Sequence, residues 1–355
     1  MVYASGAGNR TMSYQQGWPR HFAKHSRFAC VPVNLADRRL TARLRSALRA
    51  RRDGYDAVIL LHSVFSNACM VGPSMVEALA RLRAPKVYFI GNEYKLMPEK
   101  MAFCDALGVA LLVSQSESPA VHDLYRARLK CAVVGIPNTG LDPEIFQPRT
   151  PRAARPIDIG YRAVDSPDYL GHDERRRIAE FFRANAGRYG LRTDISLRPD
   201  DRFAEPAWAE FLNRCRAQLG TEAGGDYFEL TDARRLAVNA YLRERPAASH
   251  DEIQATFFQD AVPLPMRILS GRNVEAAGTK TLQILFEGHY GGYLQPDVHY
   301  IPVRKDLADA DEAMRKFRDD ALGTRIADTA YDLAMSTLTY AHLIDRFHAA
   351  LAPLV

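Results

Sequence analysis

The sequence offers little sulphur chemistry and no long apolar segment. Its five cysteines are widely scattered, none forms a Cys-x-x-Cys pair, and their odd number argues against a disulfide framework or a zinc site. Apolar runs such as 57–61 and 106–113 fall far short of the roughly 18 residues of a membrane span. The start of the chain also lacks the basic and apolar regions of a signal peptide. We therefore expect a cytoplasmic protein without structural disulfides.

The excess of one sign of charge over the other is also small, because the formal net charge is only +5 over 355 residues. No helix-turn-helix, zinc-finger or RNA-binding signature accompanies it, so nucleic acid is not an expected partner. A small positive excess suits an anionic small ligand such as a nucleoside diphosphate, or an anionic membrane surface. What remains is an ordinary globular composition, 47% hydrophobic and 25% charged, with a length that predicts two domains.

Short apolar runs alternate with helical patterns over the first 150 residues. Strands this apolar need cover on both faces, and their alternation with helices predicts a parallel α/β sheet wound on both sides. The predicted strands are 55–61, 86–90, 109–114 and 131–136, and the predicted helices are 40–50, 74–82 and 120–129.

A segment rich in proline and arginine, 150–156, predicts an interdomain linker, and the α/β pattern restarts after it. We therefore predict two Rossmann-like domains, 1–150 and 151–330. The stretch 330–351 predicts one long amphipathic helix. The predicted strands of the second domain are 157–161, 192–197, 217–220 and 282–286, and its predicted helices are 173–186, 206–215, one from about 273, and 309–318.

The segment 271–288, GRNVEAAGTKTLQILFEG, carries the most informative motif. Its Glu-Ala-Ala, followed by a small residue and an apolar strand, resembles the donor-site helix of GT-B glycosyltransferases, in particular the CgeB-like and family-4-like groups. The resemblance implies that the two domains face a cleft and that helix 331–355 returns to the N-terminal domain. It also implies that Glu275 accepts hydrogen bonds from both ribose hydroxyls of a nucleotide, as an ionised carboxylate can. The alternative is a carboxylate that only stabilises the helix dipole.

The same resemblance places further residues at the donor. Arg162 would reach the donor phosphates, because a guanidinium binds phosphate in a bidentate manner, although a surface arginine is an equal alternative. One departure is Arg267, which stands where many family-4-like enzymes carry a second glutamate. The glycine-rich segment 220–225 follows a strand and could approach a ligand closely, or be a simple loop. The remaining predicted donor-binding residues are Thr221, Glu222, Gly224 and Arg272.

Polar residues that follow strands of the first domain are candidates for catalysis. His62 follows the strand 55–61, and an imidazole can exchange a proton near neutral pH. Glu93 follows the strand 86–90 and is a candidate acid or base. Core or capping roles are the alternatives for both. The predicted sugar- or acceptor-side residues are Gly8, Asn9, Asn92, His289 and Tyr290.

These features together predict a hexosyltransferase that moves a sugar from a nucleotide sugar, with UDP or GDP, to a carbohydrate or glycolipid hydroxyl. The resemblance implies retention of anomeric configuration and a role in bacterial surface polysaccharide or glycoconjugate synthesis. No metal or other cofactor is expected, because GT-B folds neutralise the leaving group with arginine, lysine and helix dipoles. A GT-B sugar-nucleotide epimerase and a non-catalytic glycosyltransferase-like binding or assembly protein remain open alternatives.

The arginine-rich amphipathic segment 38–52 is the last feature of note. Basic amphipathic helices can dock on anionic lipid heads, which predicts peripheral contact with the inner face of the membrane. The alternative is a solvated helix whose leucines pack on the sheet.

Overall fold

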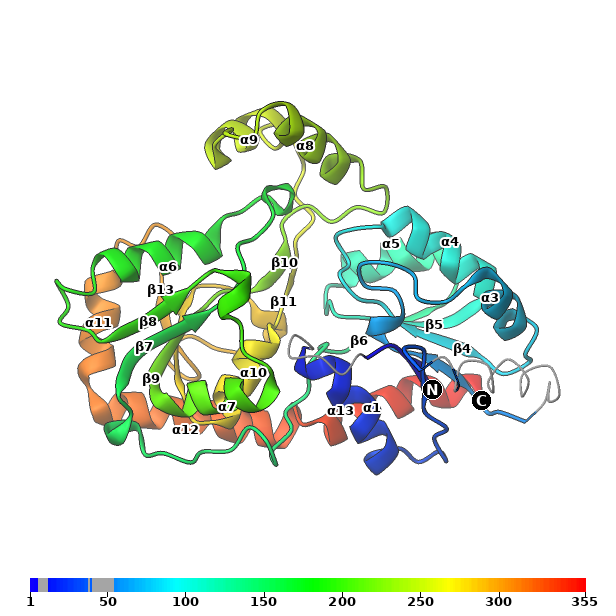
Figure 1. Ribbon diagram of the computed structural model, residues 1–355, viewed down its shortest axis with the longest axis horizontal. Coiled ribbons are helices and arrows are strands. Elements are labelled where there is room, and N and C mark those ends of the chain that lie inside the picture. Colours follow the sequence, from blue (N-terminus) through cyan, green and yellow to red (C-terminus); the bar gives the residue numbers. More distant parts are fainter. Residues whose placement is uncertain (6–11, 38, 40–53) are drawn as a thin grey trace.

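The computed structural model describes residues 1–5, 12–37, 39 and 54–355, and it shows two lobes side by side (Figure 1). The first lobe contains a six-stranded parallel sheet in the order β2-β1-β3-β4-β5-β6. Its elements are β1 (Val2–Tyr3), α1 (Ser13–His25), β2 (Val33–Asn34), β3 (Val58–Leu60), α3 (Pro73–Ala80), β4 (Lys86–Phe89), α4 (Met97–Leu107), β5 (Val109–Ser114), α5 (Pro119–Leu129) and β6 (Ala132–Gly135).

The second lobe contains a five-stranded parallel sheet in the order β13-β12-β9-β7-β8. Its elements are β7 (Ile157–Arg162), α6 (Glu174–Ala184), β8 (Thr193–Ser196), α7 (Glu205–Arg214), β9 (Cys215–Gly220), α10 (Gly271–Gly278), β12 (Leu282–Phe286), β13 (Ile301–Val303), α11 (Ala310–Arg318) and α12 (Asp320–Thr337); the last helix, α13 (Tyr340–Leu351), follows α12.

The strands form where the sequence is apolar on both sides of the pleat. In β4, Tyr88 packs with α3, α4 and α5, whereas its neighbours Val87 and Phe89 pack with α1 and α13 on the opposite face. In β12, Ile284 and Leu285 divide between the two faces of the second sheet in the same way. The prediction of two α/β sheets, each covered on both faces, is therefore confirmed, and each predicted strand is present. The predicted helix 40–50 lies outside the described residues.

The stretch 330–351 is not one continuous helix, so that prediction is wrong. The chain breaks between α12 and α13, where the Thr339 side chain accepts a hydrogen bond from the backbone of His342 and caps α13. At the break, the Leu141 nitrogen donates to the Leu338 oxygen at 2.7 Å, and the Tyr340 nitrogen donates to the Leu141 oxygen at 3.2 Å. The two connections between the lobes therefore run side by side, held by backbone hydrogen bonds that a continuous helix would exclude.

Helix α13 packs in the apolar cluster of the first lobe. Its residues Leu343, Ile344 and Phe347 are buried with Trp18 and Phe22 of α1. The chain thus leaves the first lobe after β6, builds the second sheet, and comes back with α13 below the first lobe (Figure 1).

A segment between β9 and α10 was not predicted as regular structure. Strands β10 (Ala223–Gly225) and β11 (Met266–Ile268) form an antiparallel ribbon, so part of the predicted loop 220–225 is a strand. The residues between them, 226–265, are named here the hairpin segment and carry α8 (Ala233–Glu244) and α9 (His250–Phe257). Figure 1 shows these helices above the gap between the lobes.

The hairpin segment joins the two lobes. Phe228 is buried in the core of the first lobe, with its ring 5.4 Å from that of Tyr125. Asp232 accepts hydrogen bonds from the backbone nitrogens of Leu96 at 2.6 Å and Met97 at 3.3 Å, where α4 begins. A carboxylate at this position satisfies amides that have no partner inside α4 and complements its dipole. The second lobe is thus attached to the first at a point separate from the Leu141 contact.

No helix of the described residues is both long and apolar enough to cross a membrane.

Gly224 tests the geometry of the ribbon. Its φ is +85°, and a Cβ there would collide with the carbonyl oxygen of Met266 on the paired strand. We expect Gly224→Ala to lower the free energy of unfolding, measured in urea, by about 3 kcal/mol. Gly187→Ala is the matched control, because a Cβ there meets nothing within 4 Å. Equal stability of the two variants would contradict the ribbon geometry.

Candidate functional site

A pocket opens between the lobes near the carboxyl ends of β7 and β8. The first lobe contributes Met12 and Ser13, at the start of α1. In open α/β sheets, ligands bind beyond the carboxyl ends of the strands, so its position fits a ligand site. We call it the Glu275 pocket, and the second lobe contributes Arg162, Arg202, Phe203, Glu205, Trp208, Arg272 and Glu275.

Glu275 lies in α10 with only 3% of its surface exposed. One carboxylate oxygen, Oε1, accepts a hydrogen bond from the Ser13 hydroxyl of the first lobe. The other, Oε2, accepts one from the Trp208 indole nitrogen at 2.7 Å. The small residues after Glu275 allow α10 to lie against the interlobe crossing, because a Cβ on Gly278 would collide with Leu141. The Glu-Ala-Ala-Gly motif therefore places a carboxylate where the two lobes meet.

The environment of Glu275 makes its charge responsive to neutral pH. Burial raises the pKa of Glu275 to about 7, and the hydrogen bonds from Ser13 and Trp208 and the charge of Arg272 oppose this rise. A carboxyl group with such a pKa can be ionised when donors and cations surround it. It is then an acceptor with lone pairs left for further donors.

Two arginines of the pocket lack an acidic partner. Among the described residues, no carboxylate forms an ion pair with Arg202 or Arg272, and one terminal nitrogen of Arg272 is buried without a hydrogen-bond partner. Burial and the nearby Arg175 charge lower the pKa of Arg272 to about 10, and the same two causes lower the pKa of Arg202. Like charges that lie close together repel one another, so this cluster favours the binding of an anion.

Arg162 borders the same pocket but already has partners. It donates to the Asp194 carboxylate at 2.5 Å and to the Asp194 backbone oxygen at 2.8 Å. Its guanidinium carbon lies 5.3 Å from the ring centre of Phe203 and 4.6 Å from that of Phe211. Arg162 therefore lines the pocket, but the pocket arginines that lack an acidic partner among the described residues are Arg202, which donates to the Met12 sulfur, and Arg272.

His62 lies in a closed aromatic environment. It is 2% exposed, and its ring centre is 5.6 Å from that of Tyr14, 6.0 Å from Trp18 and 5.4 Å from Phe89. Neither ring nitrogen has a hydrogen-bond partner among the described residues, and burial lowers the pKa of His62 to about 3. An imidazole held neutral in this way does not exchange a proton near pH 7, so the environment argues against the predicted catalytic role.

Glu93 is also enclosed. Its carboxylate accepts hydrogen bonds from the Ser114 hydroxyl at 2.8 Å, the Gln115 nitrogen at 2.6 Å and the Tyr125 hydroxyl at 2.7 Å. Burial raises the pKa of Glu93, and these hydrogen bonds oppose the rise. Neighbouring Asn92 donates to Asn67 at 2.7 Å. These three hydrogen bonds tie Glu93 to the end of β5 and to α5. They indicate that Glu93 has a structural role and argue against a role as a proton donor.

The predicted residues near β9 and β12 form hydrogen bonds with one another or with the nearby backbone. Glu222 is buried and accepts a hydrogen bond from the backbone nitrogen of Tyr290 at 2.6 Å, and the Tyr290 hydroxyl donates to Phe286 at 2.6 Å. The Thr221 hydroxyl donates to the backbone oxygen of Glu222 at 2.9 Å. The side chain of His289 is exposed. Gly224 pairs with β11, as described above. None of these residues lines the Glu275 pocket, whereas Arg272 does.

Arg267, which replaces a second glutamate, is held by two acids. It donates to both carboxylate oxygens of Asp226, at 2.6 and 2.7 Å, and to both of Glu174, at 3.1 Å each. Lys305 also pairs with Glu174 at 3.0 Å. The positive charge at this position is therefore compensated internally.

Some predicted features lie outside the described residues, namely Gly8, Asn9 and nearly all of the segment 38–52. Conversely, sequence reasoning missed Ser13, Arg175, Arg202 and Trp208 as site residues. Arg202 and Trp208 follow the predicted strand 192–197, so their place after a strand was a signal that could have found them. Nothing in the local sequence of Ser13 connects it with a residue 262 positions away.

The sequence also contains an Asp-x-Asp triplet, Asp309-Ala310-Asp311, a pattern that can hold a metal ion, but both of its carboxylates have partners within the protein. Asp309 accepts a hydrogen bond from the Arg304 nitrogen at 2.8 Å, and Asp311 pairs with Arg188 at 2.7 Å. Within the described part of the chain, no group of three or more His, Cys, Asp or Glu side chains could hold a metal ion.

Comparison with known proteins gives similarity in structure alone. No protein-family profile matches the sequence, and no characterised protein matches it by sequence. HepE from Anabaena, solved in complex with UDP and glucose, covers 99% of both chains with a TM-score of 0.56 at 11% identity. The DNA-modifying enzyme β-glucosyltransferase covers 99% of this chain and 98% of its own, with a TM-score of 0.56 at 10% identity. The chain therefore has the GT-B fold that its sequence predicts.

Glu275→Gln tests whether the pKa of Glu275 is raised in the folded protein. The pKa of Glu275 is raised from 4.5 to about 7, so the folded protein binds this proton more tightly than the unfolded chain does. The stability that the proton contributes is present below about pH 4.5 and is lost as the pH rises through about 7. Glutamine keeps the shape without the charge, so we expect Glu275→Gln to raise the free energy of unfolding by about 1–3 kcal/mol near pH 8.

Urea unfolding across this pH range measures the effect, and the gain should disappear near about pH 4, where the wild-type group is protonated. Glu210→Gln is the control, because Glu210 is exposed on the neighbouring helix α7. A gain that does not depend on pH would show that Glu275 is not the titrating group.

Proposed function

We propose that the protein is a glycosyltransferase that transfers a sugar from a nucleoside diphosphate sugar to a hydroxyl acceptor. The observation that carries this proposal is the pairing, in one pocket of a GT-B fold, of a buried carboxylate with arginines that lack an acidic partner. A nucleoside diphosphate offers the complementary groups, since its ribose donates two hydroxyl protons and its diphosphate is anionic.

Glu275 is proposed to bind the ribose. Trp208 holds one carboxylate oxygen at 2.7 Å and so fixes the plane of the group. Ser13 contacts the other oxygen across the cleft. A ribose hydroxyl is chemically equivalent to the Ser13 hydroxyl as a donor, so a bound nucleotide would compete with Ser13 for Glu275 or share it.

The arginines are proposed to stabilise the leaving group. As the acceptor oxygen bonds to the anomeric carbon, the bond to the β-phosphate oxygen breaks, negative charge collects on the departing diphosphate, and the hydroxyl proton of the acceptor can pass to that diphosphate. Arg202 and Arg272, with Arg175 beside them, offer charge that is positioned before the reaction begins. The proposal is that these groups, rather than a metal ion, neutralise that charge.

UDP is proposed as the first nucleotide to test, ahead of GDP, since HepE was solved with UDP and glucose and β-glucosyltransferase uses uridine diphosphoglucose. Retention of configuration, a role in bacterial surface polysaccharide or glycoconjugate synthesis, and membrane contact through 38–52 stay predictions from the sequence. Release of UDP from UDP-glucose in the presence of an acceptor distinguishes transfer from epimerisation, which regenerates a nucleotide sugar.

Glu275→Gln should weaken nucleotide binding although it stabilises the fold. Glutamine offers one acceptor oxygen and no charge to the ribose diol, so we expect the Kd for UDP-glucose to rise about tenfold or more near pH 8. Wild-type affinity should increase as the pH rises through about 7, where Glu275 ionises, and the variant should lack this dependence. Isothermal titration calorimetry measures both effects, with Glu210→Gln as the control. A variant that binds like the wild type would refute the ribose role.

Arg272→Ala should discriminate between the phosphates and the nucleoside. Because the guanidinium is proposed to contact the diphosphate, we expect the Kd for UDP to rise about 30-fold or more while that for uridine changes less than about threefold. The control is Arg214→Ala, since Arg214 is exposed at the end of α7. An equal loss for UDP and uridine would place Arg272 away from the phosphates.

A further inference from the structure

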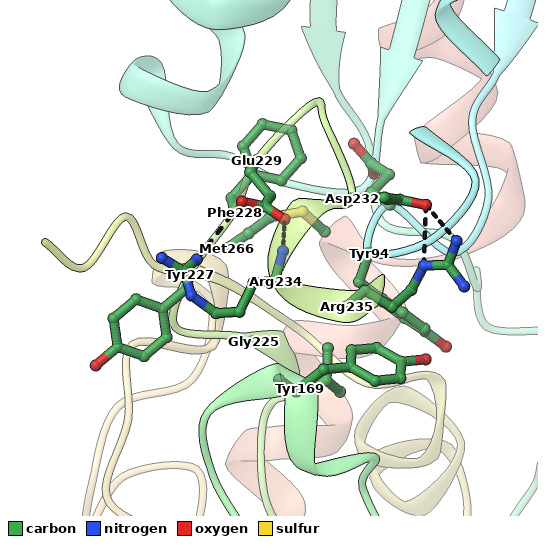
Figure 2. A pocket seen from close by; sticks show the side chains of 12 residues that line it. Tyr94, Tyr169, Gly225, Tyr227, Phe228, Glu229, Asp232, Arg234, Arg235 and Met266 are labelled. Atoms are coloured by element: carbon green, nitrogen blue, oxygen red, sulfur yellow. Dashed lines mark hydrogen bonds and ion pairs between the residues drawn. The ribbon is translucent and has the colours of Figure 1, made fainter. Parts of the chain in front are cut away.

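A second pocket lies between the loops of both lobes and the hairpin segment (Figure 2). The space between its lining residues, open mouth included, is about 410 Å³. We call it the aromatic pocket, and its lining is Glu93, Tyr94, Tyr169, Leu170, Gly225, Tyr227, Phe228, Glu229, Asp232, Arg234, Arg235 and Met266.

Tyrosines supply the chemical character of this pocket. Tyr94 follows β4 in the first lobe and Tyr169 follows β7 in the second, and their ring centres are 6.4 Å apart with 40° between the planes. Tyr227 comes from the hairpin segment, with the Arg234 guanidinium 5.0 Å from its ring centre. A tyrosine offers a flat apolar face together with a hydroxyl that can donate or accept. Such surfaces suit a ligand that carries C–H faces and many hydroxyl groups.

Each arginine of the aromatic pocket is paired with an acidic residue. Arg235 donates to the Asp232 carboxylate at 2.6 and 2.9 Å, and Arg234 lies 3.7 Å from the Glu229 carboxylate, as the dashed lines in Figure 2 show. Glu93 is occupied by its three internal donors. The Glu275 pocket differs, because Arg202 and Arg272 have no acidic partner among the described residues and so favour the binding of an anion. The aromatic pocket has no such excess and favours an uncharged ligand.

The two pockets are neighbours in the same cleft. Arg175, whose charge lowers the pKa of Arg202 and Arg272 in the Glu275 pocket, also acts on Tyr94 of the aromatic pocket by opposing the rise of its pKa. Tyr14, next to Ser13 in α1, is close enough to both pockets that Tyr94 raises its pKa and Arg202 lowers it. The linings agree with this, because Arg162, at the end of β7, borders the Glu275 pocket, and Tyr169 and Leu170, in the segment that follows β7, border the aromatic pocket.

We propose that the aromatic pocket binds the acceptor, and that the acceptor is an uncharged carbohydrate whose ring packs against Tyr169 and Tyr94. The hairpin segment forms one wall of the pocket, so its side chains help to determine which acceptor fits. Asp232 fixes the position of the hairpin segment, because it caps α4 of the first lobe while pairing with Arg235. The inference rests on the proposed function, since it names the substrate that would meet the nucleotide sugar held by Glu275.

Tyr169→Ala and Tyr94→Ala test this assignment from the two lobes separately. The probes are neutral p-nitrophenyl hexosides, the p-nitrophenyl glucuronide as an anionic counterpart, and double-stranded DNA. Binding to the protein with UDP present is measured by saturation-transfer NMR, and transfer from UDP-glucose by UDP release. We expect at least one neutral hexoside to bind and to react, and each tyrosine variant to lower its kcat/KM about tenfold through KM. Tyr169→Phe, which keeps the ring, should lose less.

Tyr331→Ala is the matched control, since Tyr331 lies on α12 and lines neither pocket. UDP binding by thermal shift shows separately whether each variant is folded with an intact Glu275 pocket. Absence of UDP binding in the wild type would refute the proposed function itself. With UDP bound, the inference is overturned if no neutral hexoside binds, if the glucuronide or DNA is preferred, or if the tyrosine variants retain the wild-type KM.

Discussion

The backbone contact between Leu141 and the break after Leu338 is the constraint on which the cleft depends. Two hydrogen bonds, of 2.7 and 3.2 Å, fix the outgoing and returning connections to each other. From this point α10 packs against Leu141 and presents Glu275, while α13 enters the core of the first lobe. Tyr340, at the start of α13, is buried against Trp18 and His21 of α1, the helix that carries Ser13. The crossing thus positions both sides of the Glu275 contact.

Electrostatics divides the cleft into two unlike halves. Around Glu275 the protein holds a carboxyl group with a raised pKa beside arginines that lack acidic partners, an arrangement that lowers the stability of the ligand-free fold. Around Tyr169 each arginine has its acid. Energetically unfavourable charges persist where a ligand can relieve them, so the contrast between the two halves itself indicates which substrate belongs in each.

The sequence predicted the sheets better than the site. Strands such as β5 and β12 are apolar on both faces, and that pattern requires no knowledge of partners. The hairpin segment was missed because its helices are half exposed, the strands that flank it are short, and its position depends on contacts such as that of Phe228 with the other lobe. Glu275 was found through a motif, whereas Ser13 and Arg175 reach the site only by tertiary proximity. His62 was located correctly after its strand, but the burial that suppresses its charge comes from α1, which the pattern did not reveal.

The double attachment of the lobes has a mechanical consequence. One link is the crossing at Leu141, and the other is the hairpin segment, where Asp232 and Phe228 engage α4 and α5. Once the side-chain contacts that also bridge the lobes are released, such as Ser13 with Glu275 and Tyr293 with Glu117, a body held at these two points keeps one easy degree of freedom, which is rotation about the line through them. Opening this cleft by separating the lobes would break the hairpin contacts, whereas a twist about that line would preserve both links. Exchange of ligands through such a twist would slide the two walls past each other.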